Sequence, residues 1–138
     1  MDEFLTVYRN LRRENIERIR DIYTADIQFI DPAHEIHGID ALLNYFERLY
    51  TNVGHVAFEF HHPVTDGSDG YVQWNMQFSH PRLKRGREIL VPGSSFLRFA
   101  RDGRAYFHRD YFDIGALLYE HLPVVGSAVS FIKRGLGR

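Results

Sequence analysis

The sequence predicts an α+β fold in which helices come first and a curved, mainly antiparallel (mixed) sheet wraps around them. Two observations predict it. Apolar residues recur at helical spacing up to about residue 50, and from residue 55 they alternate with polar residues. No helix-forming segment separates the alternating stretches, which excludes a strand–helix–strand alternation. The 138 residues suffice for one hydrophobic core, so we expect a single domain over 1–138.

Two segments carry the helical period. The first lies between residues 3 and 23, and the polar stretch 12–15 predicts a break that divides it into two short helices. The second runs to about Tyr50, with Gly38 or Asp40 as its N-cap. Its apolar residues form one face: Leu42, Tyr45, Phe46 and Leu49.

Strand signals occur once before this second helix and repeatedly after it. A strand over about Ile27 to Ile30 ends at Pro32, which cannot donate to a sheet ladder. Later strands are predicted over 55–64, 71–80, 88–100 and 104–113, joined by turns at 66–70 and 102–103 and by the basic loop 81–87. Alternation in the second of them puts four apolar side chains on one face: Val72, Trp74, Met76 and Phe78.

Residues 114–138 predict a helical extension. One short helix is expected to end near His121 and another to start at Pro123, with apolar residues at i, i+4 spacing and Lys133, Arg134 and Arg138 at its end. This amphipathic helix has several interpretations. It could pack on its own domain, cover a pocket, contact a partner, or make a peripheral membrane contact as a cationic anchor.

Composition narrows the function. A net charge of −1 gives no drive toward nucleic acid, and the absence of cysteine excludes disulfides and thiol nucleophiles. The first fifteen residues lack the apolar core of a signal peptide, and no apolar run reaches the ~20 residues of a membrane span. We therefore expect a cytoplasmic protein. The spacings of His34 with His37 and of His61 with His62 match no metal motif, so a metal is not expected.

Two acidic positions stand out. Asp31 follows an apolar strand and precedes a proline that restricts it to extended conformations, so it is either a turn residue or a general base at the mouth of an apolar pocket. In the last strand, alternation puts His108, Asp110 and Phe112 on one face. His108 and Asp110 could handle protons together or could form a structural pair that braces the strand.

The ordered motifs FIDP, HGIDAL, QWNMQF, FLRFARDGR and HRDYFD resemble the nuclear transport factor 2-like superfamily, in its SnoaL-like polyketide cyclase and ketosteroid isomerase branch. The resemblance covers roughly residues 3–113 and implies a cone-shaped sheet around an apolar pocket, commonly in a homodimer. The isomerases place their general base at the position of Asp31. The cyclases place a catalytic Asp in a His-x-Asp pattern, here His108 and Asp110. Tyr8 lies near the family's pocket tyrosine, and Ser95 takes the place of the isomerases' second acid.

The resemblance implies a cofactor-independent isomerase, cyclase or dehydratase that moves a proton on a small apolar ligand. Asp31 or Asp110 would be the acid–base, with His108 as its partner and Tyr8 and Ser95 as hydrogen-bond donors. The expected ligand-binding residues are Phe29, Trp74, Met76, Phe78, Ser95 and Phe112. A non-catalytic module that binds a hydrophobic ligand or a protein partner is the alternative.

Overall fold

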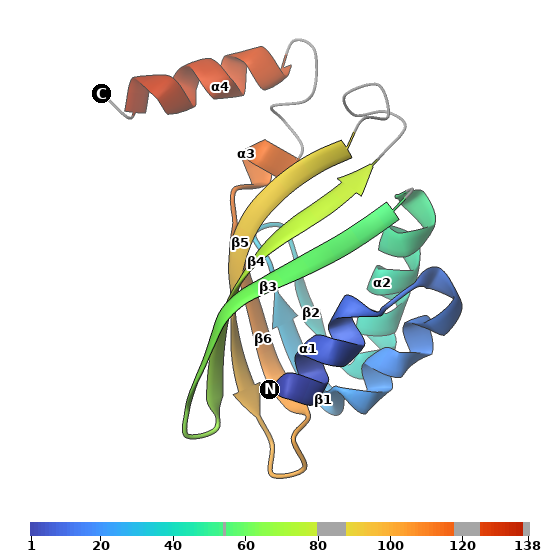
Figure 1. The fold of residues 1–138 in the computed structure, drawn as a ribbon. Coiled ribbons are helices and arrows are strands. Elements are labelled where there is room, and N and C mark those ends of the chain that lie inside the picture. The colour runs from blue at the N-terminus through green and yellow to red at the C-terminus, as the bar shows by residue number, and fades with distance from the viewer. Residues whose placement is uncertain (54, 80–87, 118–124, 137–138) are drawn as a thin grey trace.

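The computed structural model describes residues 1–53, 55–79, 88–117 and 125–136, and it confirms the predicted α+β fold. One six-stranded mixed sheet curves around the N-terminal helices (Figure 1). The sheet order is β2-β1-β6-β5-β4-β3, in which β1 and β6 run parallel and the other neighbours antiparallel. The strands are β1 (Tyr23–Ile30), β2 (Glu35–His37), β3 (His55–Asp66), β4 (Asp69–Ser79), β5 (Glu88–Phe99) and β6 (Ala105–Phe112).

The N-terminal segment forms α1 (Asp2–Arg9) and η1 (Arg13–Asp21), with the break at residues 10–12. The helix α1 buries four side chains in the core: Phe4, Leu5, Val7 and Tyr8. The second of the two predicted helices is a 3₁₀-helix. Its buried residues Ile16 and Ile19, and Ile22 just after it, recur at a spacing of three, which matches the 3.0 residues per turn of a 3₁₀-helix.

The strand β1 lies next to β6, and this pairing brings the two acidic positions of the sequence into neighbouring strands. Phe29 pairs with His108 and Ile30 with Arg109. The short edge strand β2, which the sequence did not predict, pairs with the end of β1. Gly38 then caps α2 (Ile39–Asn52) with φ of 88°, a left-handed conformation that glycine adopts without strain.

The strands β3, β4 and β5 are long and give the sheet its curvature. Within β3 the register shifts between His61 and Val64, and His62 has φ of 53°. Such a bulge bends a strand and increases its twist. In the middle of the curved sheet Trp74 pairs with Gly93, where any Cβ would overlap the indole ring. The absence of a side chain at Gly93 is therefore what leaves room for the Trp74 indole.

The end of the chain forms α3 (Ile114–Leu117) and α4 (Val125–Leu136). Figure 1 shows α4 beyond the upper end of the sheet, joined to the body through α3. The predicted helix boundaries at His121 and Pro123 and the basic loop 81–87 lie outside the described residues. Among the helices that the structure describes, none has the length and hydropathy to cross a bilayer.

Candidate functional site

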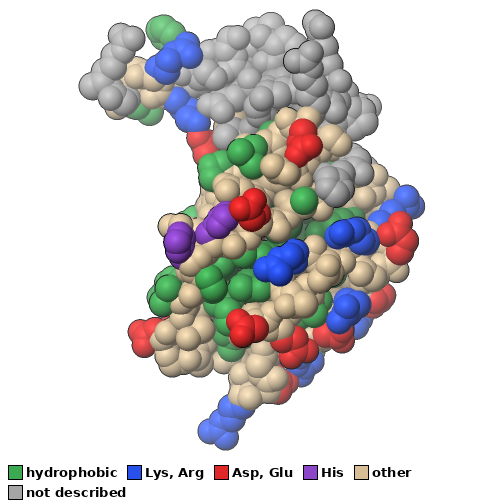
Figure 2. All heavy atoms as spheres, viewed as in Figure 1, with side chains coloured by type: hydrophobic (Ala, Val, Ile, Leu, Met, Phe, Trp, Pro, Cys, Tyr) green, Lys and Arg blue, Asp and Glu red, His purple; other side chains and the backbone are tan. Residues whose placement is uncertain are grey.

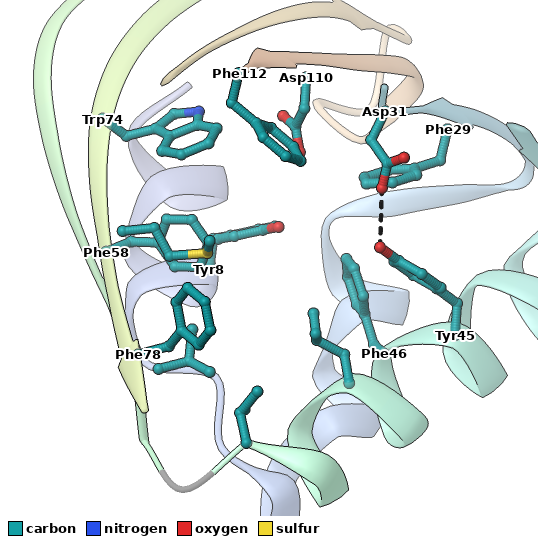
Figure 3. A pocket seen from close by; sticks show the side chains of 14 residues that line it. Tyr8, Phe29, Asp31, Tyr45, Phe46, Phe58, Trp74, Phe78, Asp110 and Phe112 are labelled. Carbon is teal, nitrogen blue, oxygen red and sulfur yellow. Dashed lines mark hydrogen bonds between the residues drawn. The ribbon is translucent and has the colours of Figure 1, made fainter. Parts of the chain in front are cut away.

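A cavity of ≈ 80 Å³ lies between α1, α2 and the concave face of the sheet (Figure 3). Its wall is largely aromatic: Phe29, Phe46, Phe58, Trp74, Phe78 and Phe112. Its polar lining residues are Tyr8, Asp31, Tyr45 and Asp110. Two carboxylates and two phenols therefore face a small space that is otherwise apolar, the kind of surroundings in which a few polar groups fix a ligand's orientation.

Asp110 lies in β6 and is held by a chain of buried side chains. The hydroxyl of Ser95, from the neighbouring strand β5, donates to Oδ1 of Asp110 at 2.5 Å. Nε2 of His108 lies 2.6 Å from the same oxygen. Behind these residues, Trp74 Nε1 donates to the Ser95 hydroxyl at 2.9 Å, and the Tyr23 hydroxyl lies 2.6 Å from Nδ1 of His108.

The direction of the hydrogen bonds follows from Tyr23. Its hydroxyl is fully buried, and burial raises its pKa well above the usual value, with a smaller contribution from Asp110. Tyr23 therefore keeps its proton and can donate it to Nδ1 of His108. This leaves the proton of His108 on Nε2, from which it is donated to Asp110. Every link of the chain then donates toward the Asp110 carboxylate.

The second carboxylate oxygen of Asp110, Oδ2, differs from Oδ1 in its hydrogen bonding. Within the described part of the chain, no side chain or backbone group donates to Oδ2. The Asp110 side chain is 12% exposed and lines the cavity. One oxygen is thus anchored by two donors and the other is available to a molecule in the cavity. A carboxylate oxygen in this arrangement can accept a proton from a bound molecule.

Tyr8 places a second reactive group in the same space. Its ring packs edge-to-face against Phe58 at 5.0 Å and Phe46 at 6.1 Å between centroids. Figure 3 shows the phenol directed into the cavity, and no described residue forms a hydrogen bond with its hydroxyl. Burial, with smaller contributions from Tyr23 and Asp110, raises the pKa of Tyr8 well above its usual value. The hydroxyl is therefore neutral and available as a donor.

Asp31 faces the cavity from the end of β1, but its oxygens are occupied. The backbone N–H groups of Ala33 and His34 donate to Oδ1 at 2.8 and 2.7 Å, and the Tyr45 hydroxyl donates to Oδ2 at 2.9 Å. Nδ1 of His34 lies 3.1 Å from Oδ1 and 3.3 Å from Oδ2. These contacts close the turn after β1 and fix the Tyr45 ring, and Figure 3 shows the hydrogen bond between Asp31 and Tyr45.

The structure places most of the residues expected at the site in the cavity wall. Lining it are Tyr8, Phe29, Asp31, Trp74, Met76, Phe78, Asp110 and Phe112. His108 and Ser95 do not line it. They lie behind Asp110 and border a second, much smaller cavity of ≈ 10 Å³. The Ser95 hydroxyl, expected to donate to a ligand, instead donates to Asp110.

Sequence reasoning missed two hydroxyl groups of the site. Tyr45 was assigned to the apolar face of its helix, and Tyr23 to the end of the first helical segment. The available signal for Tyr45 was its residue type, because a phenol on a buried helix face needs a polar partner. For Tyr23 no local signal exists, since its partner His108 is 85 residues away.

The tyrosines in and around the site give an expected pH dependence. Burial is the largest cause of a raised pKa at Tyr8, Tyr23 and Tyr45, and it raises the pKa of Tyr50 from 10.0 to about 12. In the unfolded chain these phenols ionise near 10. Their contribution to stability is therefore complete below pH ~10 and is lost as the pH rises toward the folded pKa.

We expect the free energy of unfolding in urea to decrease above pH ~10 by up to ~1.4 kcal/mol per pH unit for each such tyrosine. Tyr50→Phe keeps the ring but removes one ionisable hydroxyl, so the free energy of unfolding should fall less steeply with pH, by the contribution of one tyrosine. Tyr106→Phe, at a tyrosine that is 40% exposed, is the matched control. A free energy that stays constant between pH 10 and 12 would contradict the burial of these hydroxyls.

A curved sheet closed by helices around an apolar cavity defines the nuclear transport factor 2-like class of folds. The chain belongs to the SnoaL-like domain family, whose family model matches residues 4–108. A search of functionally curated proteins finds no match.

Solved structures share the fold at low sequence identity. A hypothetical protein with a ketosteroid isomerase-like fold from Catenulispora acidiphila, in complex with trimethylamine, has a TM-score of 0.77, with 16% identity over 88% of this chain and 94% of its own. A candidate SnoaL-like polyketide cyclase from a Jannaschia species has a TM-score of 0.73, with 13% identity over 90% of each chain. TerC, co-crystallised with polyporic acid, has a TM-score of 0.69, with 17% identity over 83% of this chain and 88% of its own.

Proposed function

We propose that the chain binds a small, largely apolar carbonyl compound and moves a proton on it without a cofactor. Asp110 is the catalytic acid–base and Tyr8 the donor to the carbonyl oxygen. The observation that carries this proposal is the asymmetry of Asp110. Two donors hold its Oδ1, whereas Oδ2 meets the apolar cavity with no donor among the described residues.

The chemistry needs one base and one donor. Oδ2 of Asp110 takes a proton from the carbon next to the carbonyl group. The electron pair of that C–H bond forms a C=C bond to the carbonyl carbon, and the π electrons of the C=O bond move to the oxygen. The neutral phenol of Tyr8 donates a hydrogen bond to the resulting enolate oxygen. The protonated Asp110 then returns the proton to the same carbon or to a conjugated one. Return to a conjugated carbon produces isomerisation, and exchange of the Asp110 proton with solvent before its return to the same carbon produces hydrogen exchange. Attack of the enolate on a second carbonyl, with the Asp110 proton going to the resulting alkoxide, would produce cyclisation.

His108 and Ser95 are positioning residues in this proposal. They do not line the cavity and act through Oδ1 of Asp110. Asp31 is also a positioning residue. With four donor contacts, its carboxylate is better suited to hold the turn and Tyr45 than to accept a substrate proton.

The cavity limits the ligand. A volume of ≈ 80 Å³ admits a few heavy atoms, and a ring compound needs the partly exposed lining residues Leu49, Val53 and Met76 to move. The aromatic wall favours an apolar body. Binding without turnover is the second candidate function. It is supported by the hydrogen bonds that join Tyr23 to His108 and His108 to Asp110, because these bonds could serve only to brace β6 against β1.

The test is proton exchange on enolisable cyclic ketones of increasing ring size in deuterium oxide, followed by NMR. We expect the protein to accelerate deuterium incorporation next to the carbonyl of the ketones that it binds, with binding measured by the fluorescence of Trp74, the chain's single tryptophan. Ketones that quench Trp74 but exchange at the uncatalysed rate would favour the non-catalytic function.

The outer face of the sheet supports the expected homodimer. Exposed apolar and aromatic side chains gather there on β3, β4 and β6: Val64, Tyr71 and Tyr111. Arg98 lies over the rings of Phe96 and Phe107 on the same face, at 5.3 and 6.0 Å from their centroids. Aromatic residues and arginine are the types enriched in protein interfaces, and a second copy covering this face would leave the cavity on the opposite face open.

A further inference from the structure

The helix α4 exposes an apolar surface. Phe131 is 72% exposed, Ile132 59% and Leu136 82%. At 100° per residue, Phe131, Ile132 and Leu136 fall on one broad side of the helix, with Phe131 and Leu136 at its two borders. Figure 1 shows the helix standing clear of the sheet. A helix that packed on its own domain would bury these side chains.

The charged residues in the α4 segment are all basic. From His121 to Arg138 the sequence contains three basic residues, Lys133, Arg134 and Arg138, and no aspartate or glutamate. In the helix, Lys133 lies next to one border of the apolar side and Arg134 next to the other. Lys133 also forms an ion pair with Asp113. Figure 2 shows basic and hydrophobic side chains next to one another on this part of the molecule.

The cavity opens toward the same end of the molecule. Its lining residues Leu49 and Val53, at the end of α2, and Phe112, at the end of β6, are partly exposed. The ion pair of Asp113 with Lys133 joins α4 to the residue directly after Phe112. A partner surface that binds α4 would therefore lie close to the cavity entrance.

We propose that α4 binds the surface of anionic phospholipid bilayers and so brings the cavity entrance to the membrane. The exposed apolar side chains would enter the boundary between headgroups and acyl chains, and Arg134 would meet acidic headgroups. Membrane binding does not depend on the proposed function. The delivery of an apolar ligand from the bilayer into the cavity does rest on it.

The experiment is co-sedimentation of the full chain with vesicles of phosphatidylcholine alone and of phosphatidylcholine with phosphatidylserine. We expect binding to the phosphatidylserine vesicles only, and weaker binding as salt screens the cations. The triple variant Phe131→Ser, Ile132→Ser, Leu136→Ser should bind roughly tenfold more weakly or worse. Arg134→Glu should bind about fivefold more weakly or worse, and as a single exposed substitution it carries little risk to the fold.

The matched control is Leu90→Ser. This side chain is 56% exposed but lies in β5, so the variant should bind vesicles like the wild type. Asp110→Asn should also bind like the wild type, which separates this proposal from the proposed catalysis. The proposal is overturned if the wild type ignores phosphatidylserine vesicles or if the triple variant binds them equally well. It is also overturned if light scattering shows that the triple substitution dissociates a dimer while the wild type binds no vesicle.

Discussion

Asp110→Asn is expected to slow deuterium exchange into a bound ketone by about 10²–10⁴-fold, the usual contribution of a positioned general base. The amide can keep its oxygen at the position of Oδ1, where Ser95 and His108 donate. The nitrogen then replaces Oδ2 and cannot accept a proton from the substrate. Because both anchoring bonds remain, the fold should be retained, and ketone binding measured by Trp74 fluorescence should change little.

The control for this variant is Asp31→Asn, which changes the other carboxylate in the cavity wall. Its exchange rate should stay within about tenfold of the wild type, because a general-base contribution of 10²–10⁴-fold is not removed. If Asp31→Asn abolished exchange while Asp110→Asn retained it, the two acidic residues would have the opposite roles.

Asp31→Ala is expected to destabilise the protein by about 2–4 kcal/mol, measured as the free energy of unfolding in urea. The Asp31 side chain is 5% exposed, and it accepts from the backbone of Ala33 and His34 and from the Tyr45 hydroxyl. Its removal leaves the Ala33 N–H and the Tyr45 hydroxyl without this acceptor, whereas the His34 N–H keeps only a long bond of 3.4 Å to the Asp31 carbonyl oxygen. Loss of several donor contacts to one charged acceptor is among the few changes that cost this much.

Asp40→Ala is the matched control, because it removes a carboxylate whose side chain is 87% exposed and pairs with Arg20 at 3.0 Å. Surface ion pairs of this kind contribute little, so we expect a change within about 1 kcal/mol. Equal destabilisation by the two substitutions would show that the contacts of Asp31 do not support the turn after β1.

Local patterns in the sequence were sufficient for the main architecture. Alternation in residues 71–80 and 104–113 correctly separates the buried from the exposed face of β4 and β6, because one face of each strand is turned toward solvent. The spacing of three among Ile16, Ile19 and Ile22 also matches a 3₁₀-helix. Over so short a segment, however, helical periods of 3.0 and 3.6 residues are hard to distinguish. The edge strand β2 was missed because its three residues carry no period at all.

The candidate site was predictable in its residue types but not in its connections. Asp31 and Asp110 both stood out from their neighbours, yet nothing local distinguishes them. What separates them is the donors that reach each oxygen: Tyr45, 14 residues from Asp31, and Ser95, 15 residues from Asp110. These contacts exist only once α2 packs on β1 and once β5 pairs with β6, so they depend on tertiary structure that a pattern in one segment does not contain.

The most direct test of the roles of Asp110 and Tyr8 is a crystal structure of the protein with an enolisable ketone in the cavity. We expect the carbonyl oxygen within hydrogen-bonding distance of the Tyr8 hydroxyl and the adjacent carbon next to Oδ2 of Asp110, while Asp31 keeps its bonds to Tyr45 and to the turn. A ketone whose reactive carbon lies against Asp31, with Oδ2 of Asp110 turned away from the cavity, would contradict these roles.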